Sequence, residues 1–207
     1  MQENRQISSY RQALKERILK TAMELFATHG VKAVKMDDIA ASLGISKRTL
    51  YEIYENKEVL LLAGVKSHHE MMRTQTFEFA QTASNVMDIV IFVYRLKSQD
   101  IHDTTPLFFE DIQRYPTVTA YLEQQHKDSQ KDFQAFMQRG VNEGYFRADV
   151  NYQLVSLQFE AFGCYMRDHR LYQMYSSGEL FNSVLLVMLR GFCTPKGVEV
   201  LDQFIRK

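Results

Sequence analysis

The sequence is poor in residues that break helices or cross-link chains. Its 207 residues include only three prolines, nine glycines and no tryptophan. Residues that favour helices, such as Leu, Glu, Gln, Lys and Met, are plentiful. The two cysteines, Cys164 and Cys193, lie in apolar stretches and make a poor disulfide framework, so a reducing cytoplasm is the expected location. The composition predicts an all-α protein.

An excess of one charge sign and long apolar runs are also missing. The 25 Lys and Arg balance 25 Asp and Glu, which argues against a protein that coats nucleic acid nonspecifically through many phosphate contacts. Any DNA binding must therefore be local, and basic residues do gather near 11–20 and 47–48. No apolar run reaches the roughly 18–20 residues of a membrane span, and the N-terminus is polar. We expect a cytoplasmic protein with no signal peptide, anchor or membrane partner.

Helical spacing of apolar residues divides the chain into a series of predicted helices. Helices are predicted near residues 9–29, 37–43 and 46–54, followed by a long one that starts after Asn56. In this arrangement Ser9 begins a capping box, Gly44 separates the second and third helices, and Ser46 caps the third. Further helices are expected near 84–98, 105–114, 116–143, 151–174 and 178–192, with a terminal one from 196.

The segment 37–54 has the pattern of a helix-turn-helix. Two short helices that cross closely need a small residue in the first, a glycine at the turn, and apolar residues that face the crossing. All of these are present at the required spacing: Ile39, Ala40, Leu43, Gly44, Ile45, Leu50 and Ile53. An ordinary helical hairpin, with Gly44 as a simple C-cap, is the alternative.

The outward face of the third helix favours DNA binding over that alternative. It carries donors and aromatic surface: Ser46, Lys47, Arg48, Thr49, Tyr51 and Glu52. Such side chains can contact base edges in the major groove and phosphates beside it. This face is therefore the candidate DNA-binding surface.

Residues 19–61, LKTAMELFATHGVKAVKMDDIAASLGISKRTLYEIYENKEVLL, resemble the TetR family of transcriptional regulators. The resemblance rests on Phe26, Gly30, Asp38-Ile39-Ala40, Gly44-Ile45-Ser46, Thr49-Leu50-Tyr51 and Lys57-Glu58-Val59-Leu60. It implies an N-terminal three-helix DNA-binding domain with the helix-turn-helix, at residues 1–56. A C-terminal helical effector-binding and dimerisation domain would then occupy residues 57–207.

The resemblance also implies roles for individual residues. Thr49, Tyr51 and Lys57 would contact the DNA backbone, and Lys47 and Arg48 would lie where the recognition helix enters the major groove. Lys35 stands where a small hydroxyl residue often caps the second helix, so a lysine–phosphate contact is expected there. Weaker similarity to the family's effector domains is found at 108–116, FFEDIQRYP, and 140–151, GVNEGYFRADVN.

Two C-terminal segments, at Leu154–Met166 and Leu180–Leu189, are apolar on nearly every face. A helix that is apolar all round needs partners all round, so we expect the exposed side to meet a second copy across a two-fold axis. Residues on which this rests are Leu157, Phe159, Phe162, Tyr165, Val184, Leu185, Val187 and Met188. The alternative is that both helices are central in the monomer.

The helix near 116–143 has an apolar stripe that Gln125 and Ser129 interrupt. An apolar cavity with a few polar groups is what a small-molecule site requires. The candidate ligand-binding residues are Gln125 and Ser129 with Phe92, Phe108, Tyr121, Phe159 and Tyr165. A wet spot on the helix surface, or ordinary core aromatics, would produce the same pattern.

No enzyme motif accompanies these features. Nucleophile elbows, phosphate-binding glycine loops and metal-ligand spacings are missing from the sequence, and His68 and His69 lack a third ligand at useful spacing. We expect no catalytic residue, metal or cofactor. The function predicted is a dimeric, sequence-specific DNA-binding regulator, a repressor released from its operator by a small apolar effector. A ligand-independent DNA-binding protein of the same fold, acting through a protein partner, remains the alternative.

Overall fold

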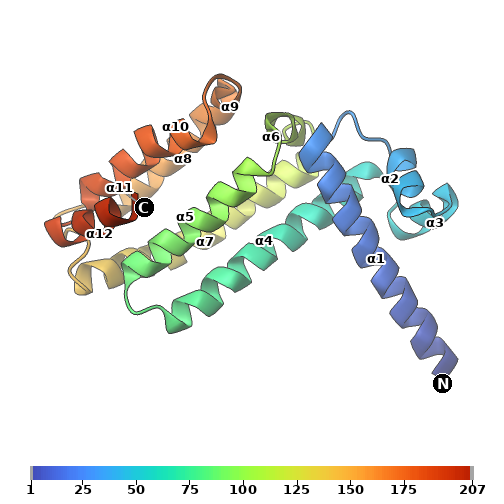
Figure 1. Cartoon of the computed structure of the whole chain (residues 1–207), viewed down its shortest axis with the longest axis horizontal. Helices are drawn as coiled ribbons and strands as arrows, with labels where there is room; N and C mark the ends of the chain where they lie inside the picture. Colours follow the sequence, from blue (N-terminus) through green and yellow to red (C-terminus); the bar gives the residue numbers. More distant parts are fainter. Residues whose placement is uncertain (1, 206–207) are drawn as a thin grey trace. The chain divides into compact units, whose positions relative to one another are not determined.

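The computed structural model describes residues 2–205, with side chains at 9–100, 102–166, 168–176 and 178–205. The chain is all-α, as predicted: helices account for nearly all of the regular structure described, with one isolated bridge between Phe146 and Cys193 (Figure 1). No helix of this described part is both long and apolar enough to cross a membrane.

The first half of the chain forms long helices interspersed with short ones. These are α1 Gln2–His29, α2 Met36–Leu43, α3 Lys47–Ile53, α4 Lys57–Thr82, α5 Val86–His102, α6 Pro106–Ile112 and α7 Pro116–Asn142. The cap predicted at Asn56 is confirmed, since its Oδ1 accepts a hydrogen bond from the Val59 amide at 2.9 Å. The start predicted at Ser9 is wrong, because α1 begins seven residues earlier, at Gln2. Residues 2–8 contain no glycine or proline, so nothing in the sequence interrupts the helix there.

The helices of the second half are interrupted more often than the apolar pattern predicts. It comprises α8 Tyr152–Asp168, α9 Leu171–Met174, α10 Ser177–Leu180, a π-helical turn at Phe181–Leu185 (η1), α11 Leu186–Phe192 and α12 Pro195–Ile205. The helix expected over 151–174 is interrupted at Arg170, whose φ of +50° is left-handed. Arginine rarely takes this conformation, so the sequence carries no signal for the break.

The residues group into two compact units. The first contains the chain up to Met71 together with Asp103–Tyr121, and the second contains Met72–His102 and the chain from Leu122 on. The predicted functional boundary at residue 56 stays a prediction. In the first unit α6 therefore joins the three N-terminal helices and the first half of α4.

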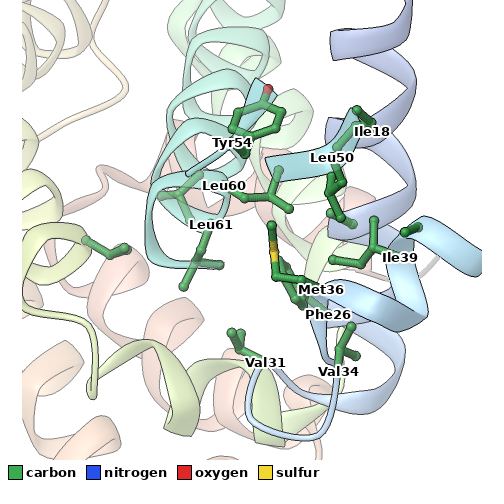
Figure 2. Close-up of a cluster of buried hydrophobic side chains, with 14 of the residues drawn as sticks. Ile18, Phe26, Val31, Val34, Met36, Ile39, Leu50, Tyr54, Leu60 and Leu61 are labelled. Atoms are coloured by element: carbon green, nitrogen blue, oxygen red, sulfur yellow. The ribbon is translucent and has the colours of Figure 1, made fainter. Parts of the chain in front are cut away.

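The core of the first unit gathers apolar residues from the N-terminal helices, among them Ile39 and Leu50, which the sequence placed inward. Phe26, Ile39, Leu50, Leu60 and Leu61 are fully buried and come together from α1, α2, α3 and α4 (Figure 2). Helix α6 adds Phe108 and Ile112 to the same cluster. Burying a large apolar side chain stabilises the fold by about 1.5–3 kcal/mol, so this cluster fixes where α3 lies.

The second unit has a core of its own. Helices α5, α7, α11 and α12 meet there, and the aromatic rings of Phe146 and Phe192 pack edge to face at 5.3 Å. Its buried members are Val86, Met87, Met137, Phe146, Phe192, Cys193 and Leu201. Both cysteines are free thiols, and burial raises the pKa of Cys193 to about 11, so this thiol stays protonated.

Candidate nucleic-acid interface

The turn between α2 and α3 is formed by the residues predicted for it. Gly44 ends α2 with a left-handed φ of +66°, and the Ile45 amide donates to the Ala40 carbonyl at 3.0 Å. A Cβ at position 44 would meet nothing within 4 Å, so backbone conformation and not space calls for glycine. Ser46 caps α3, as predicted, by accepting a hydrogen bond from the Thr49 amide at 3.0 Å.

The two helices are held by buried apolar residues on their inward sides. Ile39 and Leu50 are fully buried, and Ala40 is nearly so. Leu43, Ile45 and Ile53 are half-buried and pack against the same core. Because all of these lie inward, the opposite side of α3 is left to solvent.

The solvent side of α3 carries two exposed cations, each paired with a nearby carboxylate. Lys47 pairs with Asp37 of α2, and Arg48 Nε donates to Glu52 Oε1 at 2.8 Å. Exposed ion pairs contribute about 0–1 kcal/mol, so a phosphate or a base can replace either partner at small cost. Tyr51, which is 48% exposed, lies on this face as well. The side can therefore present two cations and a phenol to DNA.

The predicted hydroxyl contacts lie at the start of the same helix. Ser46 is exposed and Thr49 is half-buried. Their oxygens lie 2.8 Å apart, within hydrogen-bond distance. A hydroxyl has one donor and two acceptor lone pairs, so one of the pair can still donate to a phosphate.

Lys35 stands at the N-cap of α2 but does not cap it through its side chain. An ammonium accepts no hydrogen bond, and the cap is completed from the other side, where Asp38 Oδ2 accepts from the Lys35 amide at 2.8 Å. The Lys35 side chain is exposed. A phosphate contact from this lysine stays a prediction.

Lys57 has a structural role that the sequence did not reveal. Its ammonium donates to the backbone carbonyls of Val31 at 2.8 Å and Val34 at 2.9 Å, in the loop between α1 and α2. Burial lowers the pKa of Lys57, and the carboxylates of Asp111 and Asp38 partly oppose that shift. Two of its three N–H donors are used in this way, which leaves one for a phosphate.

Replacing Lys57 by alanine should therefore destabilise the protein as well as weaken DNA binding. Two partly buried carbonyls would lose a charged donor, at a cost of about 1–3 kcal/mol in the free energy of unfolding. Urea denaturation measures this loss. Lys35→Ala is the matched control, and its exposed side chain should change stability by less than about 0.5 kcal/mol. A Lys57→Ala protein as stable as the wild type would contradict the structural role.

Comparison with known proteins shows which family this helix-turn-helix resembles. Residues 18–63 match the family model described as bacterial regulatory proteins, tetR family. The HTH-type transcriptional repressor KstR2 of Mycobacterium tuberculosis is 24% identical over 143 residues, which cover 67% of this chain and 72% of KstR2. Residues 18–63 therefore form a TetR-family DNA-binding domain. The DNA-binding transcriptional repressor TetR of Mycobacteroides abscessus is 26% identical over 180 residues, 84% of this chain and 92% of that one.

Solved structures share the fold of this chain. The structure of KstR2 from Mycobacterium tuberculosis has a TM-score of 0.60 at 20% identity, and covers 87% of this chain and 95% of its own. A TetR-family regulator from Agrobacterium tumefaciens has a TM-score of 0.70 at 17% identity, covering 89% and 100%. The family's members are non-enzymatic DNA-binding regulators, in agreement with the expectation that this protein is not an enzyme.

The predicted ligand-binding residues fall in both compact units. Phe108 is buried in the core of the first unit, where Tyr121 also lies with its hydroxyl 3.0 Å from His69 Nδ1. The other five belong to the second unit: Phe92, Gln125, Ser129, Phe159 and Tyr165.

Within the second unit these five residues have different environments. Phe92 stacks on Phe79 with ring centroids 4.1 Å apart, and Phe159 packs against the unit's core. Gln125 is half-buried, whereas Tyr165 is 53% exposed. The expectation that Ser129 faces inward is wrong, because it is exposed and its hydroxyl donates to the His126 carbonyl of its own helix at 2.8 Å.

Two open depressions on the described surface lie elsewhere. One is lined by residues of the α11–α12 junction and α12, from Cys193 to Gln203, and the other by Arg11, Gln12, Lys15 and Ile53. Neither contains a predicted ligand-binding residue. In the part of the chain that the structure describes, no group of three or more His, Cys, Asp or Glu could hold a metal ion.

Proposed function

We propose that this protein is a homodimeric, sequence-specific repressor that leaves its operator when a small apolar molecule binds. The observation that carries the DNA-binding part is the exposed face of α3, with Lys47, Arg48 and Tyr51, on a helix whose opposite side is buried. A face of this kind can enter the major groove without disturbing the core that positions it.

The individual contacts follow from this placement. Lys47 and Arg48 exchange their carboxylate partners for DNA, with Arg48 directed to base edges. Ser46, Thr49 and Tyr51 contact the phosphates that flank the groove, and Lys35 and the remaining donor of Lys57 contact phosphates from α2 and α4. The charges that read DNA are thus local, in a chain with a net charge of zero.

Selection of bound sequences from random duplex DNA tests this function. We expect a roughly palindromic sequence whose half-sites lie one helical turn, or a multiple of one, apart. The protein should then shift a fragment that contains this sequence and not a scrambled one of equal length. Failure to enrich any sequence would contradict the proposal.

Dimerisation is supported by apolar side chains that the single chain leaves exposed. Leu154, Leu157 and Tyr165 lie at helical spacing on α8 and are all more than half exposed, and Val187 on α11 is 59% exposed. Next to it, Gly191 is exposed, and a Cβ there would meet nothing within 4 Å. These surfaces fit contact with a second copy better than a central position in the monomer.

An apolar effector is supported by the aromatic residues of the second unit and by the relatives. KstR2 is described as a ketosteroid transcriptional regulator. The exposed position of Ser129 instead favours the second candidate, a ligand-independent DNA-binding protein that acts through a protein partner.

A set of steroids and long-chain fatty acids separates the two candidates. A true effector should raise the melting temperature in proportion to ligand concentration and lower operator affinity about 100-fold, a coupling of about 2.7 kcal/mol. Fluorescence anisotropy with labelled operator measures the second effect, and glycerol at equal concentration is the control. An operator affinity that no compound changes would favour the ligand-independent candidate.

A further inference from the structure

A buried carboxylate lies outside the helix-turn-helix but touches the loop that leads into it. Asp111, on α6, is 7% exposed and is the only charged side chain that is buried among those the structure describes. Burying a charged group is costly unless the group is hydrogen-bonded. The groups that contact the Asp111 carboxylate therefore indicate its structural role.

Asp111 has two polar partners: the exposed Arg114, whose Nε lies 3.8 Å from Asp111 Oδ1, and the loop between α1 and α2. Its Oδ2 accepts a hydrogen bond from the backbone amide of Lys32 at 2.6 Å. The start of α6 is tied to the end of α1 as well, because the Thr105 amide donates to the Ala27 carbonyl at 2.7 Å. Helix α6 is therefore attached to the N-terminal helices by polar contacts in addition to the apolar core.

The loop approaches α6 so closely that it needs a glycine. Gly30 has a φ of +82°, and a Cβ there would lie 3.0 Å from the Leu107 Cβ and 3.1 Å from Asp111 Oδ2. Both the left-handed conformation and the tight spacing thus disfavour a side chain at this position.

Lys57 holds the same loop through its carbonyls. The amide of Lys32 is bonded to the anion of α6, and the carbonyls of Val31 and Val34 are bonded to the cation of α4. The loop ends at Lys35, and α2 begins at the next residue, Met36. Its backbone position therefore sets where the helix-turn-helix starts.

We propose that Asp111 is a positioning residue for DNA recognition, which holds the 30–35 loop so that α2 and α3 are aligned for the operator. The inference rests on the DNA-binding function proposed above. The residues needed for DNA recognition then include a carboxylate on α6, outside the predicted DNA-binding domain at residues 1–56.

The charge of Asp111 allows an effect of alignment to be separated from an effect of electrostatics. A carboxylate repels DNA, so its removal should by electrostatics alone strengthen binding to any sequence. A loss of operator affinity on removal must then come from lost alignment. Alignment matters for base readout and much less for nonspecific phosphate contacts.

Asp111→Ala should lower operator affinity about tenfold or more and leave nonspecific affinity unchanged or slightly higher. The slope of log affinity against log salt should not change, since no phosphate contact is removed. Asp111→Asn keeps an acceptor for the Lys32 amide and should retain most of the operator affinity. Fluorescence anisotropy on operator and scrambled duplexes at several salt concentrations measures all three.

Thr117→Val is the matched control. It removes another tertiary hydrogen bond of the same unit, from Thr117 Oγ1 to Glu58 Oε1 at 2.7 Å, without touching the loop. It should keep wild-type operator affinity. Equal losses in Thr117→Val and Asp111→Ala, or in Asp111→Asn and Asp111→Ala, would overturn the proposal, as would an Asp111→Ala protein that binds like the wild type.

Amide hydrogen exchange tests the contact even if the alanine variant does not fold. Lys32 is an exposed loop residue, yet its amide should be protected in the wild-type protein because Asp111 accepts its hydrogen. Fast exchange of this amide would overturn the proposal by itself. If the wild-type protein enriches no DNA sequence, it is the DNA-binding function that fails, whereas this exchange measurement still reports on the contact.

Discussion

Val187→Glu should separate the proposed dimer and abolish operator binding. Val187 is 59% exposed on α11, so a glutamate there is compatible with the folded monomer. Across a two-fold axis, however, the same substitution puts a charge on both surfaces of the contact, and burying unpaired carboxylates is strongly unfavourable. A palindromic operator is contacted by two DNA-binding domains, one from each subunit. Operator affinity should therefore fall more than about 100-fold when the subunits separate.

Sedimentation at micromolar concentration measures the first effect and anisotropy the second. Met71→Glu, which charges a similarly exposed apolar residue on α4, is the control and should remain dimeric. Val184 and Leu185 are half-buried within the chain, so charges there would disturb the monomer as well. A wild-type monomer at this concentration, or a dimeric Val187→Glu protein, would refute the proposed interface.

Arg48→Ala should weaken operator binding by roughly 1–3 kcal/mol, or about 5–150-fold, and relax the preference at one base position. In the structure Nε of Arg48 is bonded to Glu52, which leaves the two terminal nitrogens as a fork for a guanine edge. The side chain is otherwise exposed, so stability should hardly change.

Glu52→Gln is the control for this variant. It removes the ion pair but keeps the guanidinium, and it should leave the base preference intact while slightly strengthening nonspecific binding. Binding-site selection repeated with each variant reveals the base preference. If Arg48→Ala and Tyr51→Ala both bind the operator as tightly as the wild type, α3 is not the recognition helix.

The helix-turn-helix could be predicted from sequence because its rules are local. Gly44 and Ser46 act through their own backbone neighbours, and the inward positions of Ile39 and Leu50 follow from helical spacing. Those rules involve residues a few positions apart. They hold whatever the rest of the chain does.

Local rules were insufficient in the C-terminal part. The spacing of Ser129 with its apolar neighbours predicts that it faces inward, yet its hydroxyl donates to a carbonyl of its own helix and the residue is exposed. The helix expected over 151–174 is interrupted at Arg170, where no glycine or proline predicts an interruption. A long amphipathic helix can expose any of several faces to solvent, and only its packing against other helices decides which face is exposed.

The sequence by itself predicted the all-α class, the outward face of α3 and the resemblance to the TetR family, since each depends on residue types at short spacing. Only the tertiary structure decided what holds that face in place. Lys57 and Asp111 reach the α1–α2 loop from positions 26 and 79 residues away in sequence. Contacts between a side chain and a distant backbone depend on where the chain returns in space, and backbone amides and carbonyls are the same in every residue. No pattern of residue types can therefore reveal them.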